Sequence, residues 1–249
     1  MISRIRVRHF KAFESQSFDL SDHIVLAGPN NSGKTTLLQA TEILISERSP
    51  GVLYVEGESD FNLLRAWARV LDHPSRRWFE ETPFWHSNRG RNPREARAHF
   101  FALRAIKPEV RGLLLLDGDN RGLPDREVGA DGLTIARWER YEAESYLVHP
   151  EALFRYVEQH TLPLFAKAAR DFLLDQLPPN VAREPLKHSV FVEVPPASKT
   201  LLPGFFGAAN LSLPKQEYYI VAEQMNASEI PDEVRKKLDL IADAFGIGG

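Results

Sequence analysis

Short apolar runs alternate with longer amphipathic stretches along most of the chain. The runs Val52–Val55 and Leu113–Leu116 have the length and uniform apolarity of buried strands. Apolar residues also recur at helical spacing, most clearly in 234–245, where the intervals are 4, 3 and 4 residues. Strands that alternate with helices predict an α/β fold with a largely parallel sheet.

The same pattern predicts further elements. Strands are expected at 2–9, 18–20, 23–27, 132–136 and 189–194, and helices at 36–46, 59–71, 150–174 with a break at Pro163, and from Pro231 onward. Ser59 is the expected cap of the helix at 59–71, and 143–148 is expected either to open a helix or to close a strand. Ser49-Pro50-Gly51 interrupts the pattern, which predicts two domains, 1–48 and 49–249.

A phosphate-binding motif lies in the first of these domains. Residues 28–35 match G-x-x-x-x-G-K-[ST] between a predicted strand and a predicted helix. Backbone N–H groups of such a loop close around phosphate oxygens, and the helix amino end favours an anion. ATP is therefore an expected ligand, with Mg²⁺ at the Thr hydroxyl. The candidate nucleotide-binding residues are Gly28, Asn31, Gly33, Lys34, Thr35 and Thr36.

The sequence of this motif resembles the amino end of ABC-type ATPase heads of the SMC and OLD kind. It reads Gly-Pro-Asn-Asn-Ser-Gly-Lys-Thr-Thr and follows a basic strand and Phe-Lys-Ala-Phe. The resemblance covers about residues 1–46. Such heads also carry a Q-loop, a Leu-Ser-Gly-Gly signature, a Walker B carboxylate pair and a switch His, and none of these follows here. It therefore implies a truncated head with a structural or docking role rather than an autonomous ATPase.

Acidic residues follow the two buried strands. Glu56 ends the first, and Asp60 lies one helical turn further on; Asp117 and Asp119 flank Gly118 after the second. Residues i and i+2 of an extended chain point the same way, so the last pair can face one cation. Glu142 and Glu144 repeat that relation. Carboxylates that converge at neighbouring strand ends repel one another unless a cation lies between them, and oxygen ligands suit Mg²⁺ or Mn²⁺.

A Glu after one strand and Asp-x-Asp after a later one resemble the TOPRIM domain, which includes topoisomerases, primases and OLD-type nucleases. The resemblance covers roughly 50–249 and implies a Rossmann-like parallel sheet with helices on both faces. It also implies two metal ions held by Glu56, Asp60, Asp117, Asp119 and Glu144. Arg140 to Leu147 looks like the Glu-Asn-Tyr-Leu element of OLD nucleases, with Ser145 in place of Asn. The family's distal Lys is matched best by Lys199, and by Lys215 as second choice.

The amino-acid composition excludes several kinds of metal site and catalytic nucleophile. The chain of 249 residues has no Cys, which excludes disulfides, thiolate zinc sites and Cys nucleophiles, so any metal must be held by oxygen ligands or His. No apolar run approaches the roughly 18 residues of a membrane span, and a cytoplasmic protein is expected. His86, His99 and His188 show no ligand spacing and are interpreted as structural.

The net charge of −3 gives no general attraction to nucleic acid. The segment 76–111, however, has a local excess of basic residues. It supplies a positive surface on which Trp78, Phe84 and Trp85 could stack with bases, or else the Arg residues pair with acids and the aromatic rings lie in the core.

These observations predict a Mg²⁺- or Mn²⁺-dependent nuclease that acts on DNA or structured, tRNA-like RNA, in a phage-defence or DNA-processing setting. Glu56 and Lys199 are the expected catalytic residues. Two alternatives stay open. One is a compact P-loop NTPase in which Leu113–Leu116 and Asp117 form the Walker B strand. The other is a docking module for an ABC-type ATPase partner; a homodimer is also compatible with the sequence.

Overall fold

The computed structural model describes residues 4–11, 13–19, 33–34, 37, 42, 48–88, 93–118, 131–191, 194 and 196–247. The chain divides into two compact units, Met1–Pro50 and Gly51–Gly249, which are treated separately below. Within the described ranges, no helix has the length and apolarity that crossing a membrane requires.

The first unit contains a β-hairpin. Strand β1 (Arg4–Phe10) pairs antiparallel with β2 (Phe13–Asp19), which confirms a strand near 2–9 and its pairing with residues around Phe18. Gly33 of the phosphate-binding motif has φ +86°, and a Cβ there would lie 2.7 Å from the Phe13 ring, so only glycine fits. Gly28, Asn31, Thr35, Thr36 and the predicted strand at 23–27 lie outside the described residues, as does most of the predicted helix at 36–46.

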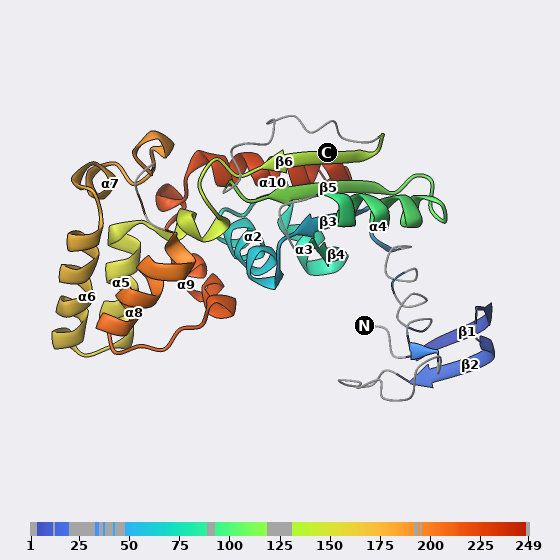
Figure 1. The fold of residues 1–249 in the computed structure, drawn as a ribbon, viewed down its shortest axis with the longest axis horizontal. Helices are drawn as coiled ribbons and strands as arrows, with labels where there is room; N and C mark the ends of the chain where they lie inside the picture. The colour runs from blue at the N-terminus through green and yellow to red at the C-terminus, as the bar shows by residue number, and fades with distance from the viewer. Residues whose placement is uncertain are drawn as a thin grey trace. The chain divides into compact units, whose positions relative to one another are not determined.

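The second unit is built on a parallel sheet (Figure 1). Its strands, in spatial order, are β4 (Trp85–Ser87), β3 (Gly51–Val55), β5 (Arg111–Leu116) and β6 (Leu133–Arg137). All three pairs are parallel, with Tyr54 opposite both His86 and Leu114. The predicted parallel α/β fold is confirmed, because the apolar runs at 52–55 and 113–116 form the two central strands.

Helices cover both faces of this sheet. The side chains of Leu53 and Leu113 belong to the main core together with residues of α2 (Glu58–Val70) and α10 (Asp232–Phe245). Helix α4 (Arg94–Arg104) packs on the opposite face, where a Cβ on Gly112 would lie 2.8 Å from the Phe100 ring. Gly112 therefore has to be glycine for α4 to approach β5 this closely.

Apart from α3 (Arg76–Glu81), the remaining helices gather beyond the end of the sheet where β5 and β6 finish (Figure 1). These helices are η1 (Ala143–Leu147), α5 (Pro150–His160), α6 (Pro163–Gln176), α7 (Pro179–Arg183), η2 (His188–Phe191), η3 (Ala197–Leu201), α8 (Leu202–Ala208), η4 (Lys215–Glu217), α9 (Tyr219–Glu223) and η5 (Ala227–Glu229). Proline occupies the first turn of α5, α6 and α7, where its missing N–H is not needed. The break at Pro163 is thus the start of a second helix.

Two element predictions are wrong. The strand expected at 189–194 is not formed over Ser189–Phe191, which continue the short 3₁₀ helix η2. The Phe191 ring lies 3.5 Å from the Arg140 guanidinium, so a side-chain contact and not a strand partner holds this segment. Helix α2 begins at Glu58, with Gly57 and not Ser59 as its N-cap, because the Asp60 carboxylate accepts a hydrogen bond from the Gly57 N–H at 3.1 Å.

Candidate metal centre

Glu56 and Asp117 stand at the carboxyl ends of the adjacent strands β3 and β5. Their side chains are near enough for Glu56 to influence the ionisation of Asp117. Burial, followed by the interaction with Glu56, raises the pKa of Asp117 far above its ordinary value. Two carboxyl groups this close must share a proton or a cation. Glu56 is exposed, so the pair is open to solvent on one side.

Asp60 joins this pair from the first turn of α2. Its side chain is buried, and Glu144 and Glu56 both act on it electrostatically. Burial and then the charge of Glu144 raise the pKa of Asp60 to about 7. The Gly57 N–H and Lys215 oppose that rise.

Glu144 lies in η1 and is fully buried. The Lys215 ammonium lies 3.0 Å from its Oε1 atom. This Lys215–Glu144 contact is an ion pair. Among the described residues, none donates a hydrogen bond of good geometry to Glu144 Oε2. Burial raises the pKa of Glu144, and Lys215 offsets part of the rise.

Lys215 brings a positive charge to these acids. Burial lowers its pKa, but Glu144 and Asp60 raise it by more, so the side chain stays protonated. The four acids of this acidic cluster, Glu56, Asp60, Asp117 and Glu144, thus influence one another electrostatically, although they come from three separate segments. Asp119, the fifth predicted ligand, lies outside the described residues.

The backbone around Asp117 is tightly enclosed. Arg137 donates a hydrogen bond from Nη1 to the Asp117 carbonyl oxygen at 2.8 Å. A Cβ on Gly118 would lie 2.1 Å from the Arg140 carbonyl oxygen and 2.5 Å from that of Trp138. Glycine between the two aspartates is therefore required by the close approach of the chain after β6.

Glu142 has a different environment from Glu144. Its buried carboxylate accepts hydrogen bonds from the Ser198 N–H and hydroxyl, both at 2.7 Å. It therefore fastens η3 beside the acidic cluster. Lys199, in η3, is exposed, with its ammonium 5.7 Å from the centre of the Tyr141 ring. The lysine that contacts an acid of the cluster is Lys215, the second choice from sequence.

A buried network joins η1 to other segments, and the sequence resemblance of 140–147 did not predict its contacts. Arg140 donates to the carbonyl oxygens of Ser145 at 3.0 Å and Pro185 at 2.8 Å. The Tyr146 hydroxyl accepts from the Arg140 N–H at 3.0 Å and donates to Glu233 of α10. Because Ser145 and Tyr146 directly follow Glu144, this network positions the carboxylate.

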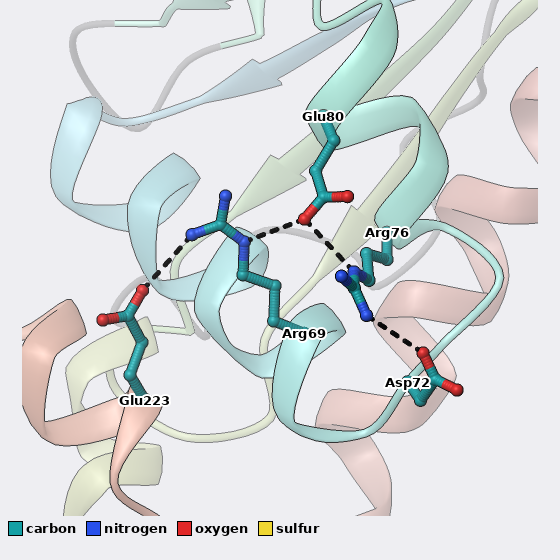
Figure 2. A network of polar contacts seen from close by, with 5 residues as sticks. All are labelled: Arg69, Asp72, Arg76, Glu80 and Glu223. Atoms are coloured by element: carbon teal, nitrogen blue, oxygen red, sulfur yellow. Dashed lines mark hydrogen bonds and ion pairs between the residues drawn. The ribbon is translucent and has the colours of Figure 1, made fainter.

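At the start of the basic segment 76–111, Arg76 pairs with nearby acids, which is one of the two arrangements expected from the sequence. Arg69 lies between Glu80 at 3.1 Å and Glu223 at 3.4 Å, and Arg76 contacts Glu80 at 3.1 Å and Asp72 at 3.2 Å (Figure 2). These contacts tie α2 to α3 and α9.

Of the two arrangements expected for the aromatic residues of this segment, Trp78 and Phe84 adopt the one in which the rings are buried in the protein. Trp85 stacks on the Phe61 ring with a centroid distance of 5.2 Å. These rings are needed for packing between α2, α3 and β4.

No three of the four described carboxylates of the acidic cluster bring an oxygen each within 4.8 Å of one another, so a divalent cation would have to draw them together on binding. Burial and mutual repulsion raise the pKa of three of the four acids, a cost that a bound cation removes. The Lys215 ammonium lies 3.0 Å from Glu144 Oε1, so a bound cation would share this carboxylate with Lys215. All available ligand atoms are carboxylate oxygens, which favours Mg²⁺ or Mn²⁺.

Comparison with known proteins gives two kinds of match. Residues 1–76 match the family model of an AAA ATPase domain, which supports an ATPase-related segment at the beginning of the sequence. The matched range includes the whole phosphate-binding motif and continues through α2. No curated protein matches the chain.

Among solved structures, the chain is similar to the C-terminal region of the OLD protein of Xanthomonas campestris pv. campestris. The structure phased with platinum is 18% identical with a TM-score of 0.46 and covers 83% of this chain and 97% of that one. The structures phased with mercury and iodine are each 17% identical, with TM-scores of 0.45 and 0.42, and each covers 80% of this chain and 97% of that one.

Proposed function

We propose that this protein is a TOPRIM nuclease of the OLD type that cleaves phosphodiester bonds of DNA or structured RNA with Mg²⁺ or Mn²⁺. The observation that carries the proposal is the placement of Glu56 and Asp117 at adjacent parallel strand ends, where Glu56 and Glu144 both act electrostatically on Asp117 and on Asp60. Function in parallel α/β sheets concentrates at this end of the strands. Glu56 is exposed, which leaves the site accessible to a polymer.

The acids divide into two ligand groups under this proposal. Glu56 and Asp117, with Asp119, would hold one ion, and Asp60 and Glu144 a second. Bound divalent ions would polarise the scissile phosphate and lower the pKa of a bound water. Glu56 is also the candidate general base, since it is the acid of the cluster that faces solvent.

Two lysines are candidates for offsetting the charge that grows on the phosphate in the transition state. Lys215 contacts Glu144 directly, which supports its assignment. Lys199 follows Ser198, whose two hydrogen bonds to Glu142 fasten it near the cluster. Lys199 remains the residue that the family resemblance favours.

The test is a cleavage assay on supercoiled plasmid DNA and on tRNA, with Mg²⁺ or Mn²⁺ and without ATP. We expect cleavage by the wild type and none by Glu56→Gln, which keeps the size of the side chain but removes its charge. Glu58→Gln changes an exposed acid two residues away and should keep wild-type activity. Lys34→Ala should also cleave normally, because the nuclease site does not include the phosphate-binding motif.

The proposal fails if both substrates stay intact with either metal, or if Glu56→Gln cleaves like the wild type. Cleavage that requires ATP and is lost in Lys34→Ala would instead favour an ATP-driven protein.

The second candidate is a nucleotide-binding function for the first unit. It is favoured by the AAA ATPase match, which includes Lys34 and the rest of the motif. ATP binding without rapid hydrolysis, and docking on an ABC-type ATPase partner or a second copy in a phage-defence system, belong to this proposal. Filter binding of labelled ATP by wild type and Lys34→Ala tests it: equal binding by both would exclude the motif as the nucleotide site.

A further inference from the structure

Two histidines that are 13 positions apart in the sequence meet on the face of the sheet covered by α4. His86 lies in the edge strand β4 and His99 in α4. Their ring centroids are 4.1 Å apart with an interplanar angle of 31°. A nitrogen of each ring lies within 4.8 Å of a nitrogen of the other.

The Nδ1 atom of each ring has a defined partner. His86 Nδ1 lies 2.9 Å from the Ser87 carbonyl oxygen, and because a carbonyl only accepts, this nitrogen carries the proton. His99 Nδ1 lies 2.8 Å from the hydroxyl of Tyr54, which is fully buried. Metal-binding histidines typically use one ring nitrogen for such a contact, which orients the ring and directs the other nitrogen to the metal.

We propose that His86 and His99 bind a transition-metal ion of the Zn²⁺, Co²⁺ or Ni²⁺ class through their Nε2 atoms. Bonds of about 2.0–2.1 Å in tetrahedral geometry put the two nitrogens about 3.3 Å apart and aim both lone pairs at the ion. Binding would therefore rotate the rings out of their present stacking at 31°. Water or ligands from outside the pair complete the coordination. Imidazole nitrogens prefer these metals to Mg²⁺, so the site differs in chemistry from the carboxylate cluster and does not depend on the proposed nuclease function.

The ion would link the edge of the sheet to the helix that covers it. Strand β4 has three residues and pairs only with β3 among the described strands. A bond from His86 through the metal to His99 adds a connection between β4 and α4. Because the two histidines are brought together by folding, binding would stabilise the native state.

The experiment titrates the full-length protein with Co²⁺ and Zn²⁺ in excess Mg²⁺, which keeps the carboxylate cluster occupied. Co²⁺ absorption reports nitrogen coordination, and calorimetry gives the Zn²⁺ stoichiometry and Kd. We expect one ion per wild-type chain and none in His86→Gln or His99→Gln. The matched control is His160→Gln: His160 Nδ1 also contacts a carbonyl, that of Tyr156 at 2.7 Å, but its ring stacks on tyrosine.

Tyr54→Phe removes the hydroxyl that orients His99 and should weaken Zn²⁺ binding by about tenfold or more. A second measurement avoids variants: in ¹⁵N spectra of the wild type, Zn²⁺ should shift the Nε2 signals of two histidines. Wild-type binding in both Gln variants, absence of Co²⁺ or Zn²⁺ binding in excess Mg²⁺, or unchanged Nε2 signals would each overturn the proposal.

Discussion

Burial decides the chemistry of individual residues in the acidic cluster. Asp60 and Glu144 are both buried, and each raises the cost of ionising a neighbour. Lys215 offsets this locally by its contact with Glu144. The residue types that form the site could be read from the sequence, since acids that end apolar strands are a local pattern. The lysine that contacts these acids could not be read from the sequence, because both candidates lie in helices of only three to five residues, too short to show a period.

The two lysines can be separated by substitution. We expect Lys215→Met to lower kcat for nucleic-acid cleavage by about 10²-fold, a size typical of losing one transition-state charge partner. Lys199→Met should have a smaller effect, since Lys199 is exposed and its ammonium faces the Tyr141 ring. Single-turnover kinetics with saturating Mg²⁺ measures both. A larger loss in Lys199→Met would instead support the family-based assignment.

The raised pKa of Asp60 predicts how the metal-free protein responds to pH. The folded protein keeps this proton up to a pH of about 7, whereas the unfolded chain loses it near the ordinary value of 3.8. Folding therefore binds a proton in this interval, and the free energy of unfolding should fall as pH rises from about 4 to about 7.

Urea unfolding in EDTA across that interval measures the effect. Asp60→Asn, which does not titrate, should have a shallower pH dependence than the wild type, and Mg²⁺ should restore stability at neutral pH. Identical slopes for the two proteins would show that Asp60 titrates normally.

At the level of elements, the short 3₁₀ helix η1 depends on one nearby side chain, Arg140, and on one distant side chain, Glu233. Arg140 holds its backbone, and Tyr146 links it to Glu233 at the start of α10. Burial and the nearby Glu233 raise the pKa of Tyr146, so its hydroxyl remains a hydrogen-bond donor. The sequence left 143–148 undecided between helix and strand, because neither period was long enough to identify.

Tyr146→Phe tests this support. It leaves Glu233 and the Arg140 N–H without their shared partner, and we expect a loss of about 1–3 kcal/mol in the free energy of unfolding. The affinity for Mg²⁺ should weaken as well, since Glu144 is two residues away. Thermal and urea unfolding give the first quantity and calorimetry the second, with Tyr219→Phe on α9 as control. Unchanged stability and unchanged Mg²⁺ affinity would contradict a positioning role for Tyr146.

At the scale of the whole molecule, sequence by itself determined the central strands, the parallel α/β class and the acids at the strand ends. Each of these comes from a local pattern whose period matches one backbone geometry. Only the tertiary structure decided that Lys215 contacts Glu144, that Arg140 and Glu233 support η1, and that His86 meets His99. The contacts of Lys215 with Glu144 and of Tyr146 with Glu233 join segments far apart along the chain, and no periodicity relates the positions in any of these contacts. Packing of the helices against the sheet brings them together.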